Sequence, residues 1–366
     1  MADAALIRGF ATVEGTAGYR TRRAARAVEG HFRTWQGLTL SSVGIGTYLG
    51  AEDEATDLAY QASVRRALEL GFNVVDSAIN YRHQRSERNV GAVLRALARE
   101  VRIAREDMLI ATKGGFMPHP AEAYVKAGIV EPDEVVGDGH CIAPRFLADQ
   151  LDRSRANLGV ETVDVYFVHN PETQLGAVDQ ATFQTRMRAA FELLEGAVRD
   201  GKIRYYGVAT RTGFRQPATA RDHLSLPGLL GLAHEVAGDA HHFGMIQLPY
   251  NLAMTEAITV ANQRIGAATL PVMQAAEQLG IYVMTSKSIM GGQAVPIPAA
   301  GLLAQILEGL RTDVQRALQF VRSTPGVGTA LCGMRSLAHV EENAGLVAVP
   351  PVPSEKLFSQ PEGERP

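Results

Sequence analysis

The 366-residue sequence predicts a single (β/α)8 barrel, the TIM-barrel class of α/β proteins, from three features. Eight short apolar or β-branched segments recur along the chain, and most of them are followed by a helical pattern. Hydrophobic residues make up 46% of the chain, enough to bury one large core. The competing fold, an open doubly wound sheet, depends on Gly44, Gly46 and Gly50, which follow the first predicted strand. Their spacing departs from the dinucleotide-binding fingerprint and no helix begins directly at them, so we reject the open-sheet fold.

The predicted strands recur at intervals of roughly 30 to 55 residues, a rhythm typical of repeated βα units. They begin at Ser41, Phe72, Met108, Val163, Arg204, Gly244, Ile281 and Gly328.

Three helices between these strands have readable apolar faces. The helix over 55–70 is predicted to bury one face and to end at Gly71; that face comprises Leu58, Ala62, Leu68 and Leu70. The next helix is expected to start with Ser86 as its N-cap; its apolar face comprises Val90, Val93, Leu94 and Leu97. The helix over 183–200 is expected to end at Gly201; its apolar face comprises Phe183, Met187, Phe191, Leu194 and Val198.

The remaining segments define the domain organisation. Residues 1–36 are predicted to form an N-terminal extension, a helix or an arm on the barrel, and residues 37–348 the barrel itself. Residues 349–366 form a proline-rich tail that we expect to be loosely held. Two long connections, 114–144 and 287–301, follow the third and seventh strands and are expected to shape a binding site.

Composition excludes several function classes. The formal net charge is −3 and the pI is about 6.4, which favours neither a nucleic-acid partner nor a membrane surface. Two cysteines, Cys141 and Cys332, fit a reducing compartment, so we expect a cytoplasmic protein. No metal site is expected, because one histidine-rich segment lacks the spacing of a zinc-binding helix; it contains His234, Glu235, Asp239, His241 and His242. The sequence does not indicate the oligomeric state.

Polar side chains lie at the ends of three consecutive predicted strands. Asp76 ends the second strand, Lys113 the third and His169 the fourth, and Tyr81 lies on the loop that leaves the second. A lysine ammonium near the phenol is expected to favour the phenolate and make Tyr81 a better acid, while Asp76 keeps Lys113 charged. His169 is suited to orient a substrate oxygen. Because no nucleophile accompanies this cluster, we expect proton transfer coupled to hydride transfer, with a cofactor supplying the hydride.

These segments resemble the aldo-keto reductase family. "NVVDSAINY" resembles the family segment with Asp and Tyr five apart, "IATKGG" its lysine strand and "VDVYFVHNPE" its histidine strand. The resemblance runs from about Gly37 to Leu346, and it matches the catalytic residues of the family with Asp76, Tyr81, Lys113 and His169. It implies a (β/α)8 barrel, NADPH bound without a Rossmann domain, and reduction of aldehydes or ketones.

The resemblance also implies a set of cofactor-binding residues. It puts Thr47 and Tyr48 on the pocket floor, and Gln247 at the nicotinamide carboxamide, with Thr210 and Asp76 nearby. Around the adenosine end of the cofactor it puts Gly333, Met334, Arg335, His339, Glu342 and Asn343. After the seventh strand it implies Ser286, Lys287, Ile289 and Gly291. An arginine suits a phosphate dianion, so Arg335 favours NADPH over NADH.

Departures from the family pattern bear on substrate and role. Ser286 stands where an aromatic ring usually stacks on the nicotinamide, and Ala209-Thr210 stands where many members have Ser-Asn. Asn170 stands beside His169, where many members have an aromatic residue, and it makes the substrate pocket more polar. The residues expected to line this pocket are Tyr48, Tyr81, His169 and Asn170. A small carbonyl compound or a sugar is therefore the expected substrate. Two alternatives stay open: an NADP-dependent sugar or alcohol dehydrogenase, and a cofactor-sensing binding subunit with residual activity.

Overall fold

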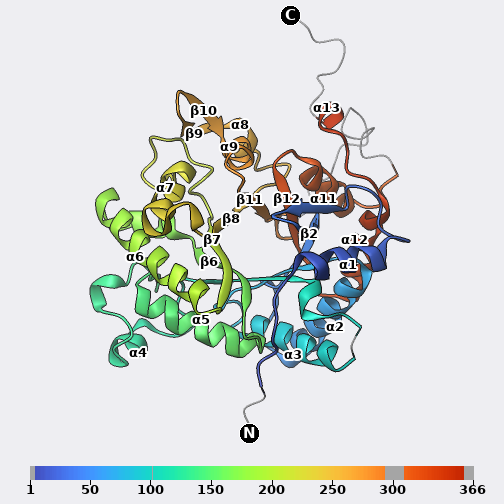
Figure 1. Cartoon of the computed structure of the whole chain (residues 1–366), viewed down its shortest axis with the longest axis horizontal. Coiled ribbons are helices and arrows are strands. Elements are labelled where there is room, and N and C mark those ends of the chain that lie inside the picture. The colour runs from blue at the N-terminus through green and yellow to red at the C-terminus, as the bar shows by residue number, and fades with distance from the viewer. Residues whose placement is uncertain (1–4, 101, 293–308, 358–366) are drawn as a thin grey trace, which may run out of the picture.

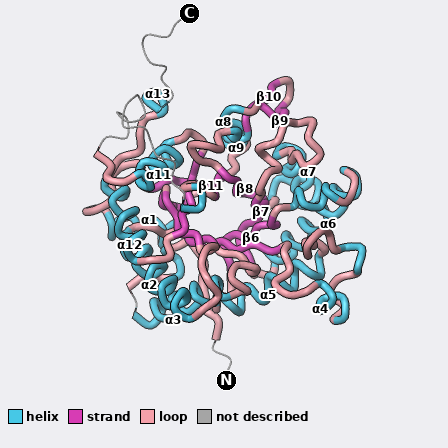
Figure 2. The backbone as a smooth tube through the Cα atoms, turned by 180° about the vertical axis from the view of Figure 1, so that it is seen from behind, coloured by secondary structure: helices cyan, strands magenta, loops and turns pink. Residues whose placement is uncertain are grey.

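Eight parallel strands close into a barrel, and each coincides with one of the eight predicted segments (Figures 1 and 2). The structure, a computed structural model, describes residues 5–100, 102–292 and 309–357. The strands are β3 (Val43–Gly46), β4 (Val74–Asp76), β5 (Leu109–Gly114), β6 (Val163–His169), β7 (Ile203–Ala209), β8 (Phe243–Pro249), β11 (Tyr282–Ser286) and β12 (Val327–Gly333). They follow one another in that order around the barrel, and β12 pairs with β3 to close it.

Helices cover the outside of this ring of strands, as Figure 2 shows. The helices that alternate with the barrel strands are α2 (Glu54–Leu70), α3 (Arg85–Glu100), α5 (Pro144–Leu158), α6 (Gln180–Arg199), α7 (Leu226–Ala237), α9 (Val272–Gln278), α11 (Asp313–Ser323) and α12 (Leu337–Ala344). The predicted inner face of α3 is buried, and Gly71 ends α2 in the left-handed conformation at φ 118°.

Two expectations about these helices are wrong. Leu58 is 59% exposed, because α2 buries the face of Tyr60 and Val64, and Leu58 lies about 200° from Tyr60 around the helix. Ser86 is not an N-cap, because α3 already begins at Arg85. Its hydroxyl instead donates to the Thr47 carbonyl at 2.6 Å, which joins α3 to the loop after β3.

The N-terminal segment packs against the amino end of the barrel. It contains α1 (Val13–Arg23) and a hairpin of β1 (Phe32–Trp35) and β2 (Leu38–Ser41). Trp35, Leu38 and Leu40 share one buried cluster with residues inside the barrel; these include Val74, Leu109, Val165, Met245 and Tyr282. This apolar layer fills the amino end, so the carboxyl ends of the strands remain for a site.

Shorter elements complete the described chain. They are α4 (Ala121–Lys126), α8 (Glu256–Thr259), α13 (Ser354–Leu357) and a second hairpin of β9 (Ala261–Ile265) and β10 (Ala268–Pro271). The long connection after β5 has its own small core, which is built on Tyr124, Val130, Cys141 and Phe146. Most of the long connection after β11 lies outside the described residues.

The tail beyond residue 348 is held more firmly than the sequence suggested. The Gln319 amide donates to the Pro350 carbonyl at 2.7 Å, and the Val352 N–H donates to the Ser323 hydroxyl at 2.9 Å. Leu357 is buried. Residues 358–366 lie outside the described part of the chain. No helix in the described ranges has the length and apolar character that crossing a bilayer requires.

Candidate active site

A buried ion pair joins the ends of β4 and β5. The Lys113 Nζ lies 2.7 Å from each carboxylate oxygen of Asp76 and donates a third hydrogen bond to the Ser77 carbonyl at 2.8 Å. Lys113 is fully buried and Asp76 is 4% exposed. Burial lowers the pKa of Lys113, and the Asp76 carboxylate opposes that shift. Because an ammonium has three N–H donors, all of them are used here and none is left for a phenol.

Tyr81 lies on the loop after β4, with its ring against this ion pair. The Lys113 Nζ is 4.9 Å from the centre of the Tyr81 ring, so lysine acts on the phenol through space. The Tyr48 ring packs edge-on against Tyr81, with ring centres 4.9 Å apart. Two elements that are distant in the sequence, the loops after β3 and β4, therefore meet at Tyr81.

The pKa of Tyr81 differs from the sequence-based expectation. Burial raises the pKa of the phenol well above its usual value of 10, and the charge of Asp76 adds to this shift. The expected lowering of the Tyr81 pKa by Lys113 is wrong, because burial, the charge of Asp76 and Tyr48 all raise it. Tyr81 is therefore protonated at neutral pH, the state that a general acid needs before it donates.

His169 ends β6 and lies beside Tyr81. The centres of the two rings are 6.0 Å apart, and Phe116 packs edge-on against the imidazole at 5.1 Å. Burial, together with Lys113 and His140, lowers the pKa of His169 well below its usual value of 6.5. The imidazole is therefore neutral at neutral pH and has one N–H to donate. Its Nδ1 is buried and has no partner in the described structure.

A chain of polar groups, none of them predicted from the sequence, holds the backbone of His169. The His140 Nε2 lies 2.8 Å from the His169 carbonyl oxygen, and the Gln174 amide contacts the His140 Nδ1 at 2.8 Å. The Arg186 guanidinium in turn donates to Gln174 at 2.5 Å. This pattern requires neutral His140 with its proton on Nε2.

His140 makes folding stability depend on pH. Burial lowers the pKa of His140 from 6.5 to about 4, so the unfolded chain binds this proton more tightly than the folded one. The contribution of neutral, buried His140 to the free energy of unfolding is fully present above pH 6.5. It is lost as pH falls toward 4, at about 1.4 kcal/mol per pH unit. Between about pH 7 and pH 5 the free energy of unfolding is expected to fall in the wild type. In His140→Gln we expect this fall to be smaller by about 2 kcal/mol, because the titrating group is absent. Urea unfolding at both pH values measures this, and equal losses in the two proteins would refute it.

Glu172 fixes the loop after β7, which is a second role that the sequence did not reveal. Its carboxylate is 4% exposed and accepts hydrogen bonds from the backbone N–H groups of Arg211 at 2.6 Å and Thr212 at 2.9 Å. Burial raises the pKa of Glu172, and these N–H groups oppose the shift. The carboxylate thereby ties the segment after His169 to the segment after Thr210.

The residues expected around the nicotinamide gather near Asp76. The Gln247 amide donates to an Asp76 carboxylate oxygen at 2.9 Å, and the Thr47 hydroxyl donates to the Asp76 carbonyl at 3.0 Å. Thr210 is buried, and its hydroxyl has no partner in the described structure. Asn170, at φ 47°, follows His169 and donates its backbone N–H to the Ala209 carbonyl at 2.6 Å. The carboxyl-terminal parts of five strands, β3, β4, β6, β7 and β8, therefore contribute polar groups to one region.

The residues expected at the other parts of the cofactor lie after β11 and β12. Half-buried Ser286 ends β11, and exposed Lys287 follows at φ 54°. Ile289, which is half-buried, and Gly291, which is exposed and has a φ of 72°, come next. The structure therefore keeps these four residues together on the described start of the connection after β11.

After β12, exposed Gly333 and Arg335 flank Met334, whose side chain is buried in the core, so only its backbone is available to a phosphate. The Ser336 hydroxyl caps α12, whose first turn carries exposed His339. Half-buried Glu342 lies further along α12, next to Asn343.

These features fit a nicotinamide dinucleotide. The buried Thr210 hydroxyl and the buried Asn343 side-chain oxygen lack partners in the described structure, and a bound carboxamide and an adenine offer the N–H donors they need. A Cβ added at Gly333 would meet no atom within 4 Å, so the backbone there is open to a ligand. The exposed Arg335 guanidinium beside it is suited to a phosphate.

The histidine-rich segment before β8 makes ordinary polar contacts. His234 lies 3.0 Å from Asp239, and His242 lies 2.9 Å from Glu195. Across the described ranges no group of three or more His, Cys, Asp or Glu side chains is arranged to hold a metal ion.

Solved structures share this fold. An aldo/keto reductase from Klebsiella pneumoniae in complex with NADP and acetate aligns with a TM-score of 0.62 at 19% identity, over 90% of this chain and 93% of that one. The holo form of an aldo-keto reductase from Bacillus halodurans aligns with a TM-score of 0.59 at 20% identity, over 89% and 93% of the two chains.

Curated relatives match over part of the chain. An L-glyceraldehyde 3-phosphate reductase of Escherichia coli K12 is 26% identical over 176 residues, which cover 48% of this chain and 43% of that protein. A 6-dehydroglucose reductase of Novosphingobium aromaticivorans is 29% identical over 182 residues, 48% of this chain and 49% of the relative. The chain thus matches about half the length of these relatives. The family model "Aldo/keto reductase family" matches residues 42–293, and the chain belongs to that family.

Proposed function

We propose that this protein is an oxidoreductase that uses NADPH to reduce a small aldehyde or ketone to an alcohol. One observation carries the proposal: Asp76, Lys113, Tyr81 and His169 come from three strand ends and one loop and meet in one buried cluster. When bound, the reduced nicotinamide supplies the hydride that the carbonyl carbon receives.

Each of the four residues has a distinct part in proton transfer. Tyr81, protonated at neutral pH, donates its proton to the carbonyl oxygen. Neutral His169 donates a hydrogen bond from its imidazole N–H to the same oxygen and so orients the carbonyl. Lys113, whose Nζ lies 4.9 Å from the centre of the Tyr81 ring, stabilises the phenolate that remains, and Asp76 holds the ammonium in place.

The substrate we propose is a small hydroxylated carbonyl compound, such as a sugar. Asn170 puts an amide next to His169, and it is half-buried in a left-handed conformation. The names of relatives support the class, since they include 6-dehydroglucose reductase and an L-galactose dehydrogenase of Arabidopsis thaliana. The same four groups serve the reverse reaction, the oxidation of a sugar hydroxyl with NADP⁺.

A screen of aldehydes, ketones and sugars with both cofactors tests the proposal. We expect NADPH oxidation with a reactive aldehyde such as a nitrobenzaldehyde, and faster turnover with a hydroxylated carbonyl. NADPH oxidation by no member of the panel, together with tight NADPH binding, would instead assign the protein to the cofactor-sensing class.

The preference for NADPH over NADH rests on Arg335. We expect Arg335→Met to weaken NADPH binding by about 10- to 100-fold, because a charge-assisted hydrogen bond to the 2′-phosphate is lost. NADH has no such phosphate, and its affinity is expected to stay unchanged. Calorimetric titration of both cofactors measures the effect, and equal weakening for the two would remove Arg335 from the phosphate site.

A further inference from the structure

The three residues directly after Tyr81 have an unusual backbone. Arg82, His83 and Gln84 have φ of 49°, 47° and 69°, although none of them is glycine. The left-handed region is costly for residues with a Cβ, and three in succession are rare. Such strain persists only where surrounding contacts impose it, and it gathers at functional sites. Contacts made by the side chains of this turn are therefore expected to impose its conformation.

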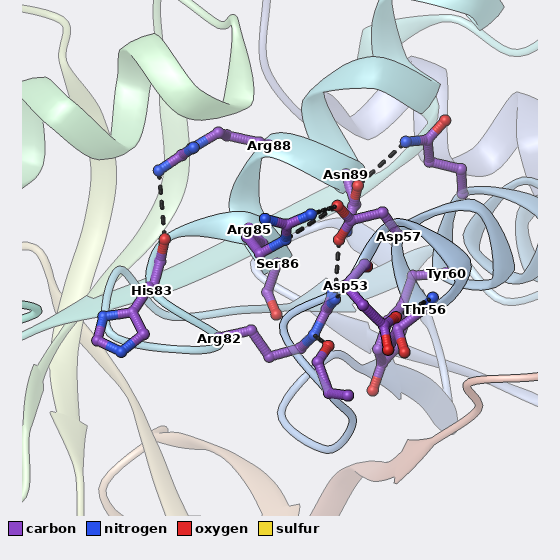
Figure 3. Close-up of polar contacts among 12 residues, drawn as sticks. Asp53, Thr56, Asp57, Tyr60, Arg82, His83, Arg85, Ser86, Arg88 and Asn89 are labelled. Carbon is purple, nitrogen blue, oxygen red and sulfur yellow. Dashed lines mark hydrogen bonds and ion pairs between the residues drawn. The ribbon is translucent and has the colours of Figure 1, made fainter.

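Arg82 supplies the main anchor. Its side chain is only 2% exposed, and its Nε donates to the Ala51 carbonyl at 2.8 Å. Its Nη2 donates to the Asp57 carboxylate at 2.8 Å, and it also lies 3.4 Å from the Asp53 carbonyl oxygen. The guanidinium lies over the Tyr60 ring, 5.3 Å from its centre. Figure 3 shows this side chain reaching from the loop after β4 to the loop before α2.

Asp57 is the carboxylate that accepts the Arg82 hydrogen bond. Besides Arg82, its carboxylate accepts from the Arg85 guanidinium at 3.0 Å and from the Asn89 amide at 2.7 Å (Figure 3). One carboxylate on α2 thus binds both the left-handed turn and the first turns of α3.

The anchored segments carry the two rings of the site. The loop that Arg82 contacts at Ala51 and Asp53 leaves β3 through Thr47 and Tyr48. The backbone that places Arg82 also places Tyr81, its chain neighbour. Tyr48 and Tyr81 are in edge-on contact at 4.9 Å. A displacement at Arg82 therefore moves both rings relative to Lys113 and His169.

We propose that Arg82 is a positioning residue, which through Asp57 and the 51–53 backbone sets the Tyr81 phenol and the Tyr48 ring for catalysis. The proposal rests on the proposed function, because it assigns Tyr81 as the acid. Arg82 does not touch the reacting atoms; it acts through the loop that bears Tyr81.

The test compares Arg82→Ala, Arg82→Gly and Arg82→Lys with Arg99→Ala, which removes an exposed arginine from the last turn of α3, away from the left-handed turn. Misplacing a catalytic group lowers rates steeply, so we expect Arg82→Ala to lower kcat by about 100-fold while calorimetric NADPH affinity stays unchanged. Arg82→Gly relieves the backbone strain but loses the anchor, so it is expected to be the more stable variant and equally slow. Arg82→Lys keeps a donor for Asp57 and is expected to recover part of kcat.

Two further readouts separate positioning from general stability. The solvent isotope effect on kcat is expected to rise in Arg82→Ala, because proton transfer from a misplaced phenol becomes slower. Asp57→Asn removes the carboxylate charge that binds Arg82, and it is also expected to lower kcat. This variant provides the test if Arg82→Ala fails to fold. Wild-type kcat in Arg82→Gly or in Asp57→Asn overturns the inference. An inactive wild type would instead overturn the proposed function.

Discussion

Tyr81→Phe is expected to lower kcat for carbonyl reduction by about 10²–10⁴-fold, the range that a positioned general acid contributes. The phenylalanine ring keeps the contacts with Tyr48 and with the Lys113 ammonium, so the fold and the NADPH affinity should be unchanged. Turnover with a nitrobenzaldehyde and calorimetric titration of NADPH measure the two quantities.

Tyr205→Phe is the matched control. Tyr205 packs against Trp35 at the amino end of the barrel, with ring centres 4.8 Å apart, so the same hydroxyl deletion there should leave kcat unchanged. If Tyr81→Phe were as active as this control, the assignment of the acid would be wrong.

Lys113→Met is expected to lower both stability and turnover. It leaves the Asp76 carboxylate buried without its ammonium, which costs about 3–5 kcal/mol of unfolding free energy. It also removes the charge that stabilises the phenolate as Tyr81 donates. Urea unfolding and steady-state kinetics measure the two losses separately.

The double variant Lys113→Met with Asp76→Asn separates these two effects. Removing both charges leaves no unpaired carboxylate in the core, so we expect much of the lost unfolding free energy to return. Turnover should stay low, because neither change restores a positive charge beside Tyr81. Recovery of turnover together with stability would mean that the ion pair serves only the fold.

The barrel was predictable because its signals are local. Each strand is a short apolar run, and the helices between them show a 3.6-residue period that survives tertiary packing. The proximity of Asp76, Lys113 and His169 was predictable for the same reason, since they lie at or next to the carboxyl ends of strands and those ends converge in a barrel.

The supporting contacts were not predictable, because they join residues remote in the chain. His140 reaches the His169 carbonyl from the long connection after β5, and Glu172 binds backbone N–H groups of the loop after β7. The pKa of Tyr81 was misjudged because the sequence shows its charged neighbours but not the depth of its burial. The left-handed turn at Arg82 has no glycine to mark it.

In the proposed reaction, the buried cluster transfers a proton from Tyr81 as the carbonyl carbon takes up hydride. Mass spectrometry of the alcohol formed with NADPH deuterated at the transferred position tests it most directly. We expect the wild type to yield an alcohol with deuterium on its carbinol carbon, and Tyr81→Phe to yield almost none in the same time. An unlabelled alcohol would rule out hydride transfer from NADPH, and labelled alcohol formed by Tyr81→Phe at the wild-type rate would rule out Tyr81 as the acid.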